Sequence, residues 1–112
     1  MVHFRSKDLT TLHRHGQFWH IYFTSGSVVI SQDEVDTWTI HVPFPLDADT
    51  SDLDPKVLVS QGLGGILGLV PIEIDEILLH NSWYPTLAIA DAYRTANGRV
   101  FLAGDSGMFC RY

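Results

Sequence analysis

The sequence has little cysteine and no cluster of basic residues. Its single cysteine, Cys110, excludes an internal disulfide and a cysteine-rich metal site. Lys and Arg total 7 against 13 Asp and Glu, so the formal net charge is −6. This balance argues against nucleic acid or an anionic membrane as a partner.

Long apolar segments are also missing. No run reaches the length of a membrane-spanning helix, and residues 1–16 lack the apolar core of a signal peptide. We therefore expect a soluble, cytoplasmic protein without a membrane partner. The chain has 112 residues, of which 46% are hydrophobic, and this is enough for a single domain over residues 1–112 with a modest core.

Residues 17–44 carry the pattern of three antiparallel strands. Three segments rich in Trp, Tyr, Ile, Val and Thr are separated by the turn-like stretches TSGS and SQDEVD. Period-two alternation predicts that one face joins the core through Trp19, Ile21, Phe23, Trp38, Ile40 and Val42. The opposite face mixes rings with hydrogen-bonding groups, namely Phe18, His20, Tyr22, Thr37, Thr39 and His41.

The rest of the chain predicts a helix and further strands. Asp54 and Pro55 form a helix start, and the helix ends among glycines. Residues 71–85 favour a long strand, 86–98 a short strand and a turn, and 99–105 a final buried strand. The fold class is therefore α+β, with an antiparallel sheet of about five strands and one or two helices. The glycines at 62, 64 and 68 follow a helix start instead of a strand, so we expect them to serve packing and not nucleotide binding.

The stretch GRVFLAGDS at residues 98–106 resembles the GRVFLAGDAAH segment of class A flavoprotein aromatic hydroxylases, which act on phenols and polyketides. A longer pattern of that class is approximated by Trp83, Ala90 or Ala92, Tyr93, Arg94, Gly98 and Asp105. Residues 18–41 resemble the sheet of its substrate domain. The resemblance covers about residues 2–106 and implies the substrate-binding middle portion of such an enzyme.

The FAD-binding parts of that class are missing from the sequence. Members of the class open with a Gly-rich β-α-β unit and carry a second Asp-Gly motif, and neither occurs here. After Gly104, Asp105 and Ser106 only GMFCRY follows. We therefore expect a truncated chain that binds no flavin and needs no other cofactor, with Gly104 and Asp105 as structural remnants.

Histidines and carboxyl groups are the candidate reactive residues. The six histidines lack the spacing of a metal site, so no metal is predicted. His20 and His41 are either hydrogen-bonded or solvated sheet residues or parts of a pocket. Glu73 and Asp75 alternate to one face of their segment, with Glu76 and His80 on the other. They form either a solvated edge or a carboxyl held in an apolar pocket, where it stays protonated as a general acid.

Our leading hypothesis is a cofactor-free isomerase or cyclase of secondary metabolism that acts on a small apolar ring compound. It would open an epoxide or rearrange a ring by general-acid catalysis while aromatic side chains stabilise positive charge. Asp75 or Glu73 would be the acid and His41 its partner. The site would be lined by His20, Tyr22, Thr39 and Trp83.

Two alternatives belong to a different class: a non-catalytic binding or interaction module, and an inactive monooxygenase fragment. A preserved pocket would favour the enzyme, and a collapsed sheet face the module. If Asp75 points away from every concavity, the acid should be sought at Glu76, Glu73 or Asp36. An exposed apolar sheet face and unpaired edges also predict a homodimer.

Overall fold

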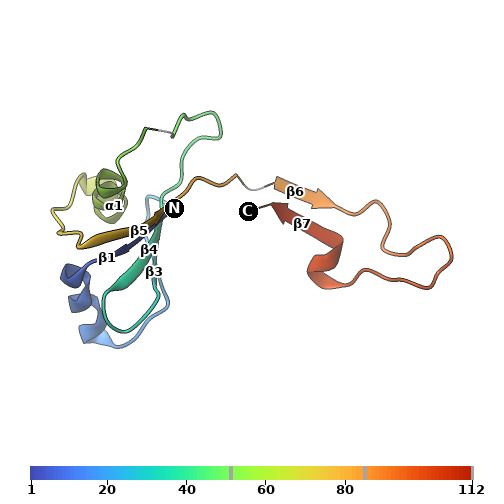
Figure 1. Cartoon of the computed structure of the whole chain (residues 1–112), viewed down its shortest axis with the longest axis horizontal. Helices are drawn as coiled ribbons and strands as arrows, with labels where there is room; N and C mark the ends of the chain where they lie inside the picture. The colour runs from blue at the N-terminus through green and yellow to red at the C-terminus, as the bar shows by residue number, and fades with distance from the viewer. Residues whose placement is uncertain (51, 85, 112) are drawn as a thin grey trace. The chain divides into compact units, whose positions relative to one another are not determined.

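The computed structural model describes residues 1–50, 52–84 and 86–111. The chain divides into two compact units, Met1–Ser82 and Trp83–Tyr112 (Figure 1). The single domain expected over residues 1–112 stays a prediction. In the described part of the chain, no helix is both long and apolar enough to cross a membrane.

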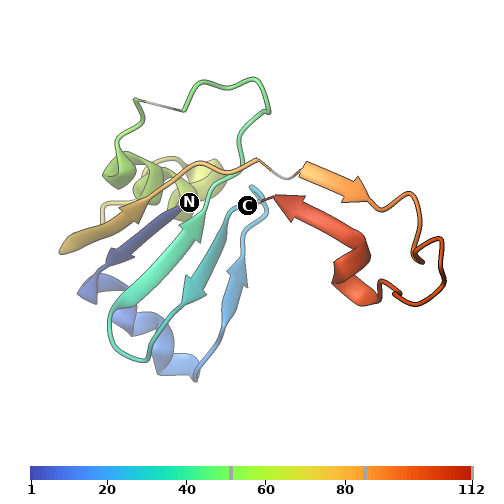
Figure 2. The same ribbon diagram turned by 45° about the vertical axis from the view of Figure 1, so that its right-hand side comes forward.

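The first unit is built on a five-stranded sheet in which all neighbouring strands are antiparallel. The strand order is β2-β3-β4-β1-β5 (Figure 2). This architecture, together with its helices, confirms the predicted α+β class. The strands are β1 (Val2–Arg5), β2 (His20–Tyr22), β3 (Val28–Ser31), β4 (Thr37–His41) and β5 (Glu76–His80).

The three-stranded meander predicted over residues 17–44 is confirmed as β2, β3 and β4. The prediction missed β1, which has only two apolar positions, Val2 and Phe4, between polar ones. β1 lies between β4 and β5 and pairs with both. The long strand predicted over residues 71–85 is limited to β5, and β1 separates it from the meander.

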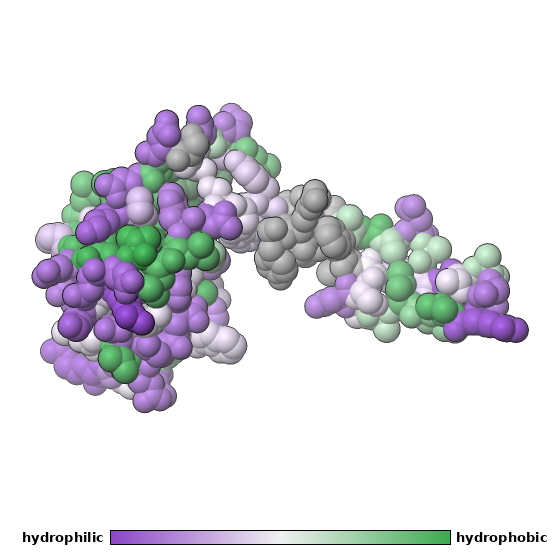
Figure 3. Space-filling model, in the orientation of Figure 1, coloured by the Kyte–Doolittle hydropathy of each residue, from purple (hydrophilic) through white to green (hydrophobic). Residues whose placement is uncertain are grey.

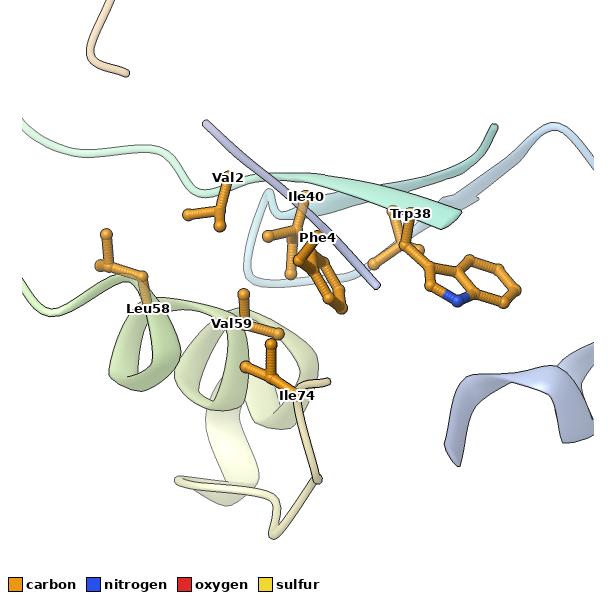
Figure 4. Close-up of a cluster of buried hydrophobic side chains, with 8 residues drawn as sticks. Val2, Phe4, Trp38, Ile40, Leu58, Val59 and Ile74 are labelled. Carbon is orange, nitrogen blue, oxygen red and sulfur yellow. The ribbon is translucent and has the colours of Figure 1, made fainter. Parts of the chain in front are cut away.

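The core lies on one face of the sheet, under the helix α1 (Pro55–Gly64). Figure 4 shows Val2, Phe4, Trp38 and Ile40 of the sheet on the side that faces Leu58 and Val59 of α1 and Ile74. Trp38 and Ile40 are fully buried, and Ile21, Phe23 and Val42 pack beside them, as predicted. Trp19 was wrongly predicted to be a core residue. It precedes β2 at the edge of the sheet and is 74% exposed.

Helix α1 begins as the sequence predicts. The Asp54 carboxylate accepts a hydrogen bond from the Lys56 backbone N–H at 2.8 Å, and Pro55 occupies the first turn. Gly62 gives the glycine-rich segment its role, because a Cβ at this position would lie 2.6 Å from Ile40 Cδ1 and 2.7 Å from Val42 Cγ2. The glycine therefore lets the helix approach the sheet closely, which confirms the packing role.

Two 3-10 helices complete the first unit. Helix η1 (Lys7–His15) packs Leu9 and Leu12 against the core. Its His13 ring stacks on Trp38, with ring centroids 5.0 Å apart. Helix η2 (Gly65–Leu67) follows α1 directly. Sequence patterns did not predict η1, because its two leucines are separated by polar residues.

The second unit is a hairpin of β6 (Thr86–Ile89) and β7 (Met108–Arg111), with the 3-10 helix η3 (Gly104–Gly107) before β7. The predicted turn is present, since Gly98 N–H donates to Thr95 O at 2.8 Å. The buried strand predicted over residues 99–105 is wrong. These residues make one isolated bridge, Arg94 to Phe101, and Phe101 is 66% exposed because no sheet covers it within the unit.

Candidate functional site

The candidate site is the face of the five-stranded sheet opposite the core. Because side chains alternate across a strand, the neighbours of the core residues point to this other side. We call it the open face, since α1 and η1 both pack on the core side. It is formed by His3, Arg5, His20, Tyr22, Val28, Ile30, Thr37, Thr39, His41, Glu76 and Leu79, as the strand register shows.

The register arranges these side chains in rows across the strands. The central row runs through five strands and contains, in order, His20, Ile30, Thr39, His3 and Leu79. The next row contains Tyr22, Val28 and His41. The rings of His20 and Tyr22 stack with centroids 5.6 Å apart and an interplanar angle of 17°. The prediction that His20, Tyr22, Thr39 and His41 share one face is therefore correct.

A buried hydroxyl lies at the centre of the open face. Thr39 is only 5% exposed, although it belongs to this face. Its Oγ1 lies 2.8 Å from His3 Nδ1 and accepts a hydrogen bond from Gln32 Nε2 at 2.9 Å. Sequence reasoning missed His3 because it missed β1. The alternation of apolar and polar residues in VHFR is the signal that could have found it.

His41 is half-buried at the end of β4. Its pKa lies below the usual value of 6.5, first because burial disfavours the charged ring. The N-terminal ammonium group and His20 repel the imidazolium and lower the pKa further. The open face therefore favours neutral His41, which can both donate and accept a hydrogen bond.

The predicted acids lie at one end of the sheet, beside the start of η1. Asp75 accepts a hydrogen bond from Lys7 N–H at 3.0 Å through Oδ2, and its own N–H donates to Arg5 O. Glu73 N–H donates to Asp8 Oδ2 at 2.8 Å, and Glu73 O accepts from Ser6 Oγ at 2.6 Å. These contacts fasten the segment before β5 to η1.

The structure does not bring Asp75 and His41 together. Asp75 hydrogen-bonds beside Arg5, which is paired with Thr37, and His41 lies four residues further along β4. That spacing is about 13 Å along the strands, and two strand spacings add about 10 Å across them. The segment that contains Asp75 therefore does not lie beside the meander, because β1 separates β5 from β4.

The other candidate residues are spread over the molecule. Glu76 forms an exposed ion pair with Arg5 at 3.3 Å. The Asp36 carboxylate accepts a hydrogen bond from Thr37 Oγ1 at 3.4 Å. Trp83 belongs to the second unit and is 41% exposed. The roles predicted for Asp75, Glu73, His41, His20, Tyr22, Thr39 and Trp83 stay predictions.

A cavity of about 170 Å³ adjoins the candidate residues only through Gln32, whose side chain donates to Thr39 Oγ1. None of the predicted site residues lines it. Its lining consists of His13, Gln17, Phe18, Ser31, Gln32, Asp33 and Glu34. Burial raises the pKa of the Asp33 carboxyl, but hydrogen bonds from the Thr37 side chain and from the N–H groups of Thr37, Val35 and Asp36 outweigh it and lower the pKa to about 2. Asp33 is thus an anion that organises the loop between β3 and β4.

Comparison with known proteins finds two related monooxygenases. The chain is 43% identical over 115 residues to the FAD-dependent monooxygenase apdD of Emericella nidulans, a match covering 95% of this chain and 18% of that protein. It is 41% identical over 115 residues to the FAD-dependent monooxygenase opdD of Penicillium oxalicum, covering 95% and 22%. No protein-family model and no solved structure matches the chain.

The chain is therefore related to a segment of FAD-dependent monooxygenases. It spans about a fifth of the length of these curated relatives. The resemblance to flavin monooxygenases is confirmed, while the assignment of the segment to substrate binding stays a prediction.

The Gly-Asp turn of the second unit does not form an FAD site by itself. Gly104 has a positive φ of 54°, and a Cβ there would meet nothing within 4 Å. The loop is closed instead by Ser106 Oγ, which donates to Ala103 O at 2.6 Å and accepts from Ala103 N–H at 2.8 Å. A phosphate cradle needs backbone N–H groups converging on a concave site, and Gly104 and Asp105 are exposed.

Proposed function

We propose that the first unit supplies the substrate-facing wall of a flavin monooxygenase and that the open face is the surface that contacts the substrate. The observation that carries this proposal is the central row of the open face. It combines a ring, two aliphatic side chains and a buried hydroxyl-histidine pair, His20, Ile30, Leu79, Thr39 and His3. The relationship to the two FAD-dependent monooxygenases supports it.

The chemistry of the open face suits a flat, largely apolar ring compound. Val28, Ile30 and Leu79 offer aliphatic surface, and the stacked rings of His20 and Tyr22 offer aromatic faces. Tyr22 is 73% exposed, so its ring can make contact without rearrangement. Ligand sites of this kind pair apolar walls with a few placed polar groups, and Thr39, His3 and His41 are those groups here.

The cofactor-free isomerase remains a second hypothesis, and the carboxyl contacts give it little support. General-acid catalysis requires a carboxyl within about 2.6 to 3.2 Å of the reacting group, or one bridging water. Asp75 instead accepts from Lys7 N–H, and Glu76 pairs with Arg5. These contacts agree better with a surface that binds the substrate but supplies no catalytic acid.

The proposal is tested by titrating the ¹⁵N-labelled chain with 4-ethylphenol and following backbone amide shifts. We expect the largest shifts in β2, β3 and β4 and in β1. Tyr22→Ala should weaken binding several-fold, because an aromatic contact contributes about 0.5–1.5 kcal/mol. Tyr84→Ala is the matched control, since Tyr84 is also an exposed tyrosine but belongs to the second unit. Shifts confined to α1 or to the residues lining the cavity would contradict the proposal.

A further inference from the structure

Thr39 Oγ1 sits between two side chains whose roles can be assigned. Gln32 Nε2 donates to it at 2.9 Å, so this oxygen already accepts one hydrogen bond. The second contact, at 2.8 Å, is to His3 Nδ1. A neutral imidazole nitrogen either donates or accepts, and the direction of this contact therefore fixes the tautomer of His3.

The burial of Thr39 decides that direction. If His3 Nδ1 carried the proton, Oγ1 would accept twice, and its own hydrogen would have no acceptor. Among the described residues, Gln32 and His3 are the only hydrogen-bond partners of Oγ1. Leaving a hydroxyl hydrogen unpaired at a position that is 5% exposed is unfavourable. In the arrangement that pairs every hydrogen, Gln32 Nε2–H donates to Thr39 Oγ1, and the Thr39 hydroxyl donates to His3 Nδ1.

We infer that His3 presents its Nε2–H to the open face as the hydrogen-bond donor that recognises an oxygen of the ligand, with Thr39 and Gln32 as positioning residues. When Nδ1 accepts, neutral His3 must carry its proton on Nε2. Within the described part of the chain, Nε2 has no hydrogen-bond partner. The ligand role of His3 rests on the proposed function of the open face.

The surroundings of His3 indicate the class of oxygen that is recognised. Ile30 lies in the same row one strand beyond Thr39, and Leu79 is the direct neighbour of His3 on β5. Two cations lie near this row: Arg5 is paired with Glu76, and the N-terminal ammonium, which lowers the pKa of His41, donates to Asn81 O at 2.9 Å. A neutral carbonyl oxygen on an apolar ring suits this setting better than a carboxylate, which would need a charged partner. The substrate class is thus an aryl ketone or a related ring carbonyl compound.

The first arm of the test measures the tautomer without any ligand. Two-dimensional ¹H–¹⁵N spectra of the imidazole nitrogens at pH 8.5, where histidines are neutral, distinguish Nδ1–H from Nε2–H. We expect His3 to be the Nε2–H form, with Nδ1 shifted as a hydrogen-bond acceptor. Thr39→Val should abolish that acceptor shift, and Thr39→Ser should retain it. An Nδ1–H form of His3 in the unmodified chain would show that the Thr39 hydroxyl does not donate to His3 Nδ1, and this would overturn the inference.

The second arm compares 4-hydroxyacetophenone with 4-ethylphenol, which has the same shape but a methylene in place of the carbonyl. We expect the unmodified chain to prefer the ketone by about 2- to 10-fold, the range of one neutral hydrogen bond. His3→Phe and Thr39→Val should remove the preference, so that each variant binds the two compounds within about 2-fold of one another, whatever its absolute affinity. Thr39→Ser should keep the preference, which a purely structural role would not explain.

The two arms separate the possible failures. Binding of both compounds at the open face with no ketone preference would overturn the role of His3 and leave the proposed function standing. Failure of both compounds to perturb the open face would overturn the proposed function and, with it, the ligand role of His3. A preference that survives in His3→Phe would assign carbonyl recognition to another residue and refute the inference.

Discussion

Replacement of Asp75 separates the catalytic role predicted from the sequence from the structural role seen in the fold. Asp75 Oδ2 accepts from the Lys7 N–H at 3.0 Å, at the start of η1. The first N–H groups of a helix have no partner within the helix, and loss of a capping side chain typically costs about 1 kcal/mol. We therefore expect Asp75→Ala to lower the free energy of unfolding by about 1 kcal/mol. Asp75→Asn should lower it by less, because the amide oxygen can still accept.

Urea unfolding followed by circular dichroism measures this effect. The slope of unfolding free energy against urea is about 1–3 kcal/mol per molar for small proteins, so the midpoint should fall by about 0.3 to 1 M for Asp75→Ala. Thr10→Ala is the control, because Thr10 makes only an exposed bond within η1, to Lys7 O. Both Asp75 variants should bind 4-ethylphenol within about 2-fold of the unmodified chain. Unchanged stability in Asp75→Ala would refute the structural account. If the chain turns over a ring substrate and Asp75→Asn reduces that turnover by about 10²- to 10⁴-fold, Asp75 is the general acid.

The remaining predictions concern titration, packing and assembly. The His41 pKa is lowered on folding, so the unfolded chain binds more protons than the folded one below about pH 6.5, and stability should fall as the pH drops through that range. An NMR titration midpoint of His41 above 6.5 would contradict this, and His41→Gln should remove that part of the pH dependence. Gly62→Val should lower the free energy of unfolding by about 1–3 kcal/mol, because the new side chain overpacks against Ile40 and Val42. Gln61→Val, on the exposed side of α1, is the control and should be nearly neutral in chemical denaturation. Figure 3 shows hydrophobic side chains on the surface of the first unit, whose exposed residues include Ile66, Leu67 and Leu69. Because soluble monomers avoid large exposed apolar patches, we expect light scattering to give the mass of a homodimer. A monomer mass at all concentrations would refute that.

The meander and α1 could be predicted because local signals agree with their final packing. Period-two alternation from Ile21 to Val42 matches the two sides of the sheet, and Asp54 with Pro55 marks the start of α1. The open face followed from the same alternation. Its polar members His20, Thr39 and His41 are therefore predictable from the sequence.

The position of β1 could not be predicted, because non-local pairing decides it. Val2 and Phe4 are too few to mark a strand, and they become core residues only between β4 and β5. The same omission leaves His3 out of the predicted site. In the second unit, the apolar run from Val100 to Ala103 has strand composition but finds no sheet there to cover it.

The central claim is that the open face contacts an apolar ring ligand, and intermolecular nuclear Overhauser effects test it most directly. With 4-ethylphenol bound to isotope-labelled protein, we predict effects from the ligand ring protons to the Ile30 methyl groups and to the His20 and Tyr22 rings. Effects to Leu58 and Val59 on the core side, or to Phe18 at the cavity, would contradict the account.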